Sequence, residues 1–232
     1  GATAVPTFHS LGLYWTPAGG AASKQVLVKY RKKGDCSWSD GLSMEYNPIS
    51  GNADYRGSVV NLTPNTEYEI ELTLEGTSIT SILTIKTWTE NPPKGTTTTI
   101  PSQSITFDIT SAMSGTANAY RVFDGQGATI DVANNADNAI AIDADYVIVR
   151  NIKLKGAIRF GIRIFGGHDI IIEDCDISNW GRINGSDLGF GENYNGAIWG
   201  GATDIERVTI QRCKMHHPRT DANNWAEPWK SS

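Results

Sequence analysis

The chain has 232 residues, enough for one large or two ordinary domains, and 39% of them are hydrophobic, which is sufficient to form buried cores. Charged residues make up only 19%, and the formal net charge is -5, so the chain has no strong positive field for a nucleic acid or an anionic membrane surface. No stretch approaches the roughly 18 consecutive apolar residues of a membrane-spanning helix. We therefore expect neither nucleic-acid binding nor a membrane span.

Two compositional features narrow the fold class. Glycine, threonine, serine, asparagine and aspartate are abundant, as in proteins built from many short strands joined by tight turns. The three cysteines, Cys36, Cys175 and Cys213, are too few for a disulfide scaffold and lack the spacing of a zinc site. We therefore predict an all-β protein and assign no residue as a metal ligand.

The first part of the chain, from residue 5 to about residue 88, consists of short alternating segments separated by turn clusters, which is typical of an antiparallel sandwich. The segment 61–70 is more specific, because Leu62 and Pro64 precede Tyr68. It resembles the tyrosine corner of fibronectin type III domains, in which the tyrosine hydroxyl bonds backward to the main chain. The resemblance implies a fibronectin-III-like β-sandwich over residues 1–90.

A change in composition marks the boundary between two domains. Pro92 and Pro93 are followed by Lys94, Gly95 and four threonines. Two prolines exclude ladder hydrogen bonds and stiffen the chain. We predict a linker over residues 91–100.

Beyond the linker a motif recurs. The tracts 147–154, 170–177 and 208–215 align without gaps, at intervals of 23 and 38 residues, and one insertion at 179–193 accommodates the difference. Coils near 23 residues with a looped-out insertion resemble the right-handed parallel β-helix of the pectate-lyase-like superfamily. The resemblance implies a short β-helix of about four coils over residues 101–232, with an N-terminal cap at about 102–119. We expect this helix to be incomplete at its C-terminal end, because no cap follows Met215.

Alternation assigns directions to the side chains. Each tract follows a shorter piece with apolar residues two apart, namely Ile140 and Ile142, Ile162 and Ile164, and Ala197 and Trp199. The tracts place one set of residues inward, which comprises Val147, Val149, Ile152, Leu154, Ile170, Ile172, Cys175, Ile177, Val208, Ile210, Cys213 and Met215. Two outward strips comprise Lys153, Asp176 and Lys214, and Arg150, Glu173 and Gln211. We interpret Cys175 and Cys213 as buried packing thiols, because a disulfide between stacked strands would need a change of rotamer.

The resemblance also implies where a polysaccharide would bind, namely on the face of the short strands and their adjoining loops. The candidate substrate-binding residues are Asp143, Arg159, Trp180, Asp187, Tyr194, Asn195 and Arg219. A lyase acting on a uronic acid neutralises the sugar carboxylate with Ca²⁺ or arginine and removes a proton with a base. The candidate catalytic residues are Arg163, Arg182 and His216.

Several of these residues have a simpler explanation. Arg159 and Arg163 also fit a solvated outer strand, and adjacent His216 and His217 point to opposite faces, so they are a poor metal pair. A hydrolase would instead need two carboxylates on opposite sides of the scissile bond, for which Asp187 with Glu192 or Asp221 is the nearest pair.

Two functions remain open. The first is an extracellular, secreted or cell-surface carbohydrate-interacting protein that resembles polysaccharide lyases, binds an acidic polysaccharide and forms the N-terminal part of a larger glycan-degrading protein. The second is a non-catalytic structural or adhesive surface protein, including a filament subunit that self-associates end to end through the open C-terminal coil. The sequence leaves open whether the protein is an enzyme at all.

Overall fold

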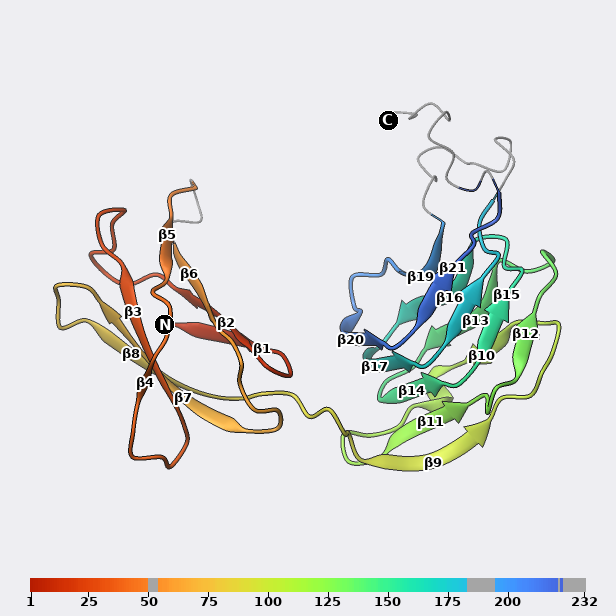
Figure 1. Ribbon diagram of the computed structural model, residues 1–232, viewed down its shortest axis with the longest axis horizontal. Helices are drawn as coiled ribbons and strands as arrows, with labels where there is room; N and C mark the ends of the chain where they lie inside the picture. Colours follow the sequence, from red (N-terminus) through yellow and green to blue (C-terminus); the bar gives the residue numbers. More distant parts are fainter. Residues whose placement is uncertain (50–53, 183–194, 221, 223–232) are drawn as a thin grey trace. The chain divides into compact units, whose positions relative to one another are not determined.

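A computed structural model describes residues 1–49, 54–182, 195–220 and 222 (Figure 1). The chain divides into two compact units, Gly1–Asn91 and Pro92–Ser232. Strands dominate both units, and the one helical element is a 3-10 turn at Ser111–Met113 within the described residues. No helix in the described part is long and apolar enough to cross a membrane. The prediction of an all-β protein is confirmed.

The first unit contains two antiparallel sheets. One has the order β1-β2-β6-β5 and the other the order β4-β3-β7-β8. Their bounds are β1 (Thr3–Pro6), β2 (Leu11–Trp15), β3 (Val26–Lys32), β4 (Ser39–Asp40), β5 (Glu45–Asn47), β6 (Asp54–Val59), β7 (Glu67–Leu74) and β8 (Thr80–Lys86). Alternate residues of β2 and β7 are buried in one shared core, because successive side chains of a strand point to opposite faces.

Tyr68 makes the backward contact that the sequence predicts. Its hydroxyl oxygen accepts a hydrogen bond from the Thr63 backbone N–H at 2.9 Å, and the side chain is only 4% exposed. Trp15 is also buried, at 6% exposure. The antiparallel architecture is therefore observed, whereas membership of the fibronectin type III family stays a prediction.

The second unit contains three parallel sheets wound from one stretch of chain. Their orders are β10-β13-β16-β19, β20-β17-β14-β11-β9 and β12-β15-β18-β21. The bounds are β9 (Lys94–Thr99), β10 (Phe107–Ile109), β11 (Tyr120–Asp124), β12 (Thr129–Asp131), β13 (Asn138–Asp143), β14 (Val147–Arg150), β15 (Lys153–Lys155), β16 (Phe160–Gly166), β17 (His168–Glu173), β18 (Asp176–Ser178), β19 (Gly196–Gly200), β20 (Glu206–Gln211) and β21 (Lys214–His216). This winding is a parallel β-helix, as predicted.

We name the coils by their three strands. The first coil holds β10, β11 and β12, the second β13, β14 and β15, the third β16, β17 and β18, and the fourth β19, β20 and β21. Val147 lies opposite Ile170, which lies opposite Val208, and Leu154, Ile177 and Met215 stack in the same way. The three tracts therefore lie on one another in the predicted register.

The interior column changes at the fourth coil. Ile170, Ile172 and Ile177 of the third coil are fully buried, whereas Ile210 and Met215 at the equivalent positions are 46% and 44% exposed. The inward side chains of a coil are shielded from water only where a further coil or a cap covers them. The prediction of a buried thiol is accordingly right for Cys175, which is 2% exposed, and wrong for Cys213, which is partly exposed.

Left-handed turn residues recur at the same point of successive coils. The turn between the second and third sheets has its positive φ at Gln126, Asn151, Asp174 and Arg212, with values of 51° to 53°. Asparagine and aspartate tolerate this conformation because their short side chains hydrogen-bond locally. The repeated conformation keeps every coil the same shape, so the strands stay in register.

The structure differs from the prediction at the start of the second unit. Lys94–Thr99, within the predicted linker, is strand β9 and pairs in parallel with β11. Threonine is β-branched and favours a strand, and the two prolines lie before the first residue of the strand, where the Pro93 carbonyl still accepts a hydrogen bond from the Tyr120 N–H at 2.8 Å. The predicted cap region contributes β10, which pairs with β13 in the first parallel sheet.

Candidate functional site: an arginine–aromatic patch and an acidic cavity

On the outward face of sheet β10-β13-β16-β19, residues of three neighbouring strands lie side by side in register. Ala141 lies opposite Arg163, and Arg163 lies opposite Trp199. The sequence predicted a different pairing for β19, with Ala197 and Trp199 equivalent to Ile162 and Ile164. That register is wrong by one residue, since Ile198 pairs with Ile162, and a slip of one residue moves Trp199 to the outward face.

Arg163 stands over aromatic rings. Its guanidinium carbon lies 4.1 Å from the ring centroid of Phe165 and 5.1 Å from that of Trp199. The Arg163 Nε is buried without a hydrogen-bond partner among the described residues. Cation–π contacts hold the guanidinium in place without using its in-plane N–H donors.

A stacked pair of rings supports this arginine. Phe160 and Trp199 lie with ring centroids 4.9 Å apart and planes inclined by 15°, and Phe160 is fully buried. Arg159 lies over Phe160 at 5.4 Å and 3.9 Å from an Asp137 carboxylate oxygen. We call Arg159, Phe160, Arg163, Phe165 and Trp199 the arginine–aromatic patch.

An acidic cavity of about 310 Å³ lies at the ends of the strands of the same sheet. The Asp143 Oδ1 and Asp204 Oδ2 atoms lie 2.9 Å and 3.3 Å from the point where a Cβ on Gly166 would be, so glycine leaves room for both carboxylates. Asp145 also lines the cavity, and its Oδ1 lies 3.6 Å from His168 Nε2. The cavity lining comprises Ser111, Ser114, Asp143, Ala144, Asp145, Gly167, His168 and Asp204.

A carboxylate clasp adjoins this cavity. Asp169 accepts hydrogen bonds from Arg207 Nη2 at 2.9 Å and from the His168 ring at 2.7 Å. Burial opposes the charge of Asp169, but these hydrogen bonds outweigh it and hold the Asp169 pKa below its ordinary value. Burial and the Asp169 charge raise the pKa of Tyr120, on the first coil, to about 12. The clasp joins the third and fourth coils through the Asp169–Arg207 pair.

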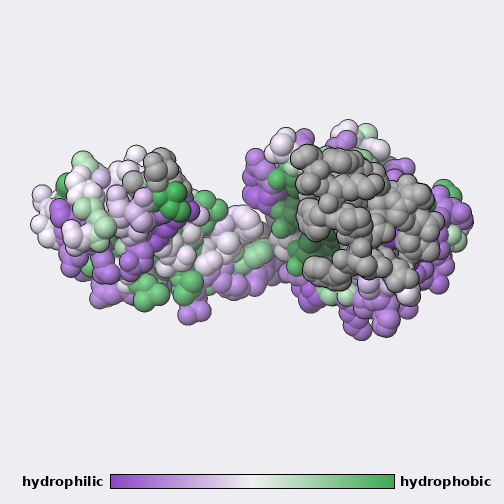
Figure 2. Space-filling model, turned by 90° about the horizontal axis from the view of Figure 1, so that it is seen from above, coloured by the Kyte–Doolittle hydropathy of each residue, from purple (hydrophilic) through white to green (hydrophobic). Residues whose placement is uncertain are grey.

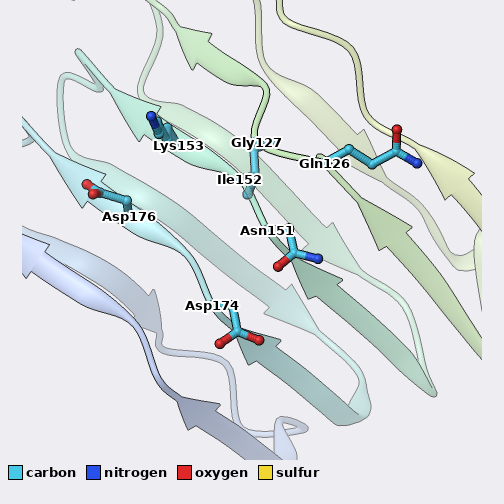
Figure 3. A pocket seen from close by; sticks show the side chains of 7 residues that line it. All are labelled: Gln126, Gly127, Asn151, Ile152, Lys153, Asp174 and Asp176. Carbon is cyan, nitrogen blue, oxygen red and sulfur yellow. The ribbon is translucent and has the colours of Figure 1, made fainter.

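A second cavity, of about 380 Å³, lies at the turns between the second and third sheets (Figure 3). Its lining comprises Gln126, Gly127, Asn151, Ile152, Lys153, Asp174 and Asp176. Asn151 donates to Asp124 at 3.1 Å, and Asp176 accepts from His216. These polar groups bond to neighbouring coils, so this cavity is better explained by coil stacking than by ligand binding.

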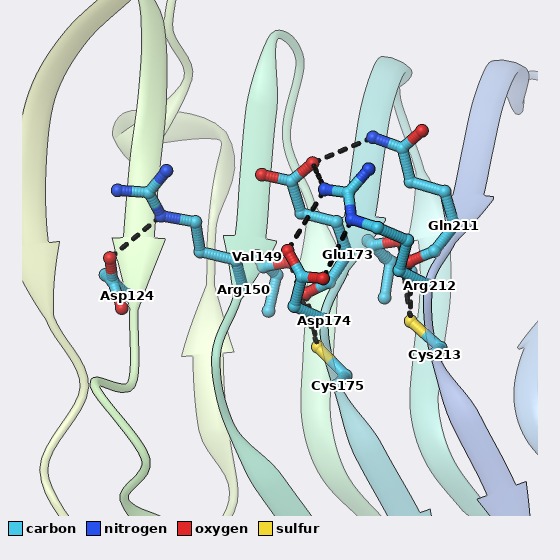
Figure 4. A network of polar contacts seen from close by, with 10 residues as sticks. Asp124, Val149, Arg150, Glu173, Asp174, Cys175, Gln211, Arg212 and Cys213 are labelled. Atoms are coloured by element: carbon cyan, nitrogen blue, oxygen red, sulfur yellow. Dashed lines mark hydrogen bonds and ion pairs between the residues drawn. The ribbon is translucent and has the colours of Figure 1, made fainter.

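Ion pairs connect the coils along this edge (Figure 4). Arg150 donates to Asp124 at 2.8 Å, and Arg212 donates to Asp174 and Glu173, each at 2.8 Å. The outward strips predicted from the sequence are present, because Lys153, Asp176 and Lys214 are in register and so are Arg150, Glu173 and Gln211. Arg150, Glu173 and Gln211 bond to side chains of neighbouring coils, and Asp176 does so through His216.

The predicted site residues are scattered over several environments. Arg163, Arg159 and Asp143 lie on or beside sheet β10-β13-β16-β19, but His216 lies in β21 of another sheet and bonds Asp176 at 2.9 Å. Arg182 is 5% exposed and donates to Asn195 at 3.2 Å, and Asn195 is itself buried. The three candidate catalytic residues are not brought together.

The remaining predictions concern the segments around the insertion. Trp180 is 9% exposed and packs in the core, so it does not present a face to a sugar ring. The Arg219 backbone N–H donates to the Trp180 carbonyl at 2.8 Å. Asp187, Tyr194, Glu192 and Asp221 lie outside the described residues.

Sequence reasoning missed Phe165, Trp199 and Asp204. The alternation that places Ile162 and Ile164 inward already places Arg163 and Phe165 outward, so a signal for Phe165 was present. Asp204 lies in the turn between β19 and β20, and no periodicity marks it. Among the described residues, no group of three or more histidine, cysteine or acidic side chains is placed to hold a metal ion, so we derive no step through calcium.

No family model and no curated protein sequence matches the chain. Among solved structures, the sensor domain of an anti-sigma factor from Pseudobacteroides cellulosolvens is similar at 18% identity and a TM-score of 0.29, covering 38% of this chain and 94% of that one. A computationally redesigned β-sandwich protein matches at 19% identity and a TM-score of 0.30, covering 39% and 94%. Pectate lyase from Erwinia chrysanthemi, in complex with tetragalacturonic acid, matches at 12% identity and a TM-score of 0.25, covering 90% and 77%. Likenesses of this strength assign no family.

Proposed function

We propose that the second unit is an extracellular carbohydrate-binding module that holds an acidic polysaccharide on the arginine–aromatic patch. The observation that carries the proposal is the Arg163 guanidinium over Phe165 and Trp199 on the outward sheet face. A guanidinium matches a carboxylate with two parallel N–H donors, and an aromatic face accepts the apolar side of a sugar ring. The patch therefore offers both contacts that a uronic acid needs.

The geometry supports binding better than cleavage. Of the three candidate catalytic residues, only Arg163 lies on the outward face of this sheet, and its guanidinium is engaged by aromatic rings. A general base must come within hydrogen-bond reach of the proton that it removes. His216 and Arg182 are held elsewhere by Asp176 and Asn195.

The test measures the affinity of the full chain for pectate, alginate and glycosaminoglycan oligosaccharides by calorimetry, with a neutral oligosaccharide alongside. We expect Arg163→Ala to weaken binding of the acidic ligands about 10-fold to 100-fold, which corresponds to about 1.5–3 kcal/mol for a charge-assisted hydrogen bond. The matched control is Lys153→Ala, which removes the same charge from a different sheet and should leave affinity unchanged. Equal weakening by both variants, or none by Arg163→Ala, would contradict the proposal.

Ultraviolet absorbance of the same mixtures, with and without Ca²⁺, reports unsaturated products. Their appearance would show that the protein is a lyase and would overturn the assignment of a binding module. Product formation that Arg163→Ala abolishes would assign Arg163 a role in that reaction.

A second candidate function is end-to-end assembly through the fourth coil. The specific observation is that Ile210 and Met215, at inward positions, are about half exposed. Contacts between unlike surfaces propagate into filaments unless a ring closes. Light scattering at rising concentration should then show growth that Met215→Lys suppresses, and a monomer at every concentration would exclude this function.

A further inference from the structure

Cys175 and Cys213 occupy equivalent positions on neighbouring coils. The residue pairs on either side, Glu173 with Gln211 and Asp176 with Lys214, are in register. The Lys214 backbone N–H also donates to the Cys175 carbonyl at 2.8 Å. Adjacent strands lie about 4.8 Å apart, within the roughly 4.4–6.8 Å Cα separation of disulfides, so formation of the bond requires a change of side-chain rotamer and no movement of the strands.

The two sulfur atoms have similar polar neighbours (Figure 4). Cys175 Sγ lies 3.2 Å from the Glu173 carbonyl oxygen, and Cys213 Sγ lies 3.3 Å from the Gln211 carbonyl oxygen. Cys175 is buried beneath the fourth coil, whereas Cys213 is partly open to solvent. A reagent in solution therefore reaches Cys213 first.

The pKa values of the two thiols also differ, and in the direction that makes Cys213 the more reactive thiol. Interaction with the neighbouring Cys175 thiol lowers the pKa of Cys213 to about 7, against the effect of partial burial. Interaction with Cys213, together with burial, raises the pKa of Cys175. An accessible thiolate beside a protonated, buried thiol is the arrangement of redox-active cysteine pairs.

We propose that Cys213 and Cys175 form a thiol–disulfide exchange site that locks the fourth coil to the third. The Cys213 thiolate attacks one sulfur of a small disulfide, which breaks the S–S bond and releases one thiolate. The Cys175 thiol then loses its proton and attacks Cys213 Sγ, which releases the second thiol and leaves the Cys175–Cys213 bond. The two cysteines lose two electrons and two protons, and the small disulfide takes them up.

The chemistry of the cysteine pair does not require glycan binding. The pair does, however, lie between the third and fourth coils, which also carry the arginine–aromatic patch. The fourth coil carries Trp199 on β19, so a covalent bond to the third coil would fasten one side of the arginine–aromatic patch. The reduced pair is the form in the present structure.

The experiment uses the full chain with Cys36→Ser, because Cys36 is exposed and would react by itself. After incubation with oxidised glutathione at neutral pH, intact mass and peptide mapping should show the loss of two hydrogen atoms and a Cys175–Cys213 crosslink without bound glutathione. In the same background, Cys175→Ala should leave a stable glutathione adduct on Cys213, and Cys213→Ala should leave Cys175 unmodified.

A lasting adduct on Cys213 while Cys175 is present would overturn the proposal, and so would no reaction. The chain with Cys36→Ser decides alone if the Cys175→Ala variant does not fold. As a second measurement, alkylation of the native chain should modify Cys213 with a midpoint near pH 7 and spare Cys175. Faster alkylation of Cys175 would contradict the assigned order.

Discussion

Ile172 and Ile210 occupy one interior column, but among the described residues only Ile172 has a coil on both sides. Ile172 is fully buried between Val149 and Ile210, and Ile210 is 46% exposed. Substituting either by alanine removes three carbon atoms, and burial of each contributes about 0.8 kcal/mol, or roughly 2.4 kcal/mol in a closed core. The cavity left at Ile172 adds to this loss, so we expect Ile172→Ala to lower the free energy of unfolding by about 3–4 kcal/mol.

The same change at the fourth coil should cost much less. About half of the Ile210 side chain already contacts water, and its removal opens no closed cavity, so we expect Ile210→Ala to cost about 1 kcal/mol. Urea unfolding of the full chain, followed by circular dichroism, measures both values. The first unit is unchanged in both variants, so any transition that belongs to it serves as an internal reference.

Equal losses would refute this reasoning. A loss at Ile210 as large as that at Ile172 would mean that the fourth coil is covered in solution, either by a second copy or by another layer. Repeating the Ile210→Ala measurement at several protein concentrations separates these cases, because only coverage by a second copy depends on concentration.

Two further predictions concern polar contacts. Tyr68→Phe removes the acceptor of the Thr63 N–H and should destabilise the first unit by about 1–2 kcal/mol, measured by urea unfolding, without changing glycan affinity. Asp169→Asn breaks the clasp with Arg207 and should cost about 1–2 kcal/mol at neutral pH. Because the folded-state pKa of Asp169 is lowered, its contribution is present above about pH 4 and is lost as pH falls through the folded pKa. The wild-type and Asp169→Asn stabilities should therefore converge in acid, and a constant difference would contradict the clasp.

The solenoid could be predicted because its strands repeat two simple signals. Apolar residues that point inward recur two positions apart within each tract, and the tracts at Val147, Ile170 and Val208 align without a gap. The predicted register of β19 was wrong because Ala197, Ile198 and Trp199 are three apolar residues in a row, so alternation does not decide which of them point inward. The strand also follows an insertion, so its position along the coil cannot be counted from the preceding repeat. The exposure of Cys213 was also out of reach, because it depends on what lies above the coil rather than on alternation.

The sequence predicted only those residues of the candidate site that lie on regular strands. Arg163 and Asp143 lie on regular strands, so alternation and strand ends place them. His216 also lies on a strand, but the sequence alone did not show that β21 belongs to a different sheet from β16. Residues in turns, such as Asp204, become neighbours of the site only through winding of the coils.

The same winding makes glycan binding depend on how the fourth coil is held. Arg163 and Trp199 face each other only in the present register, and a slip of one residue would put Ile198 outward and Trp199 inward. The backbone ladder of β16 and β19 is short, so side-chain contacts between β17 and β20 help to fix that register. The Arg207–Asp169 pair is one of these contacts, and its arginine is 39% exposed, whereas the arginine of the Arg212–Glu173 pair is 56% exposed. An ion pair contributes less as its members become more exposed to solvent. If the patch binds a uronic acid, substitutions at Asp169 should therefore weaken binding although Asp169 lies outside the patch.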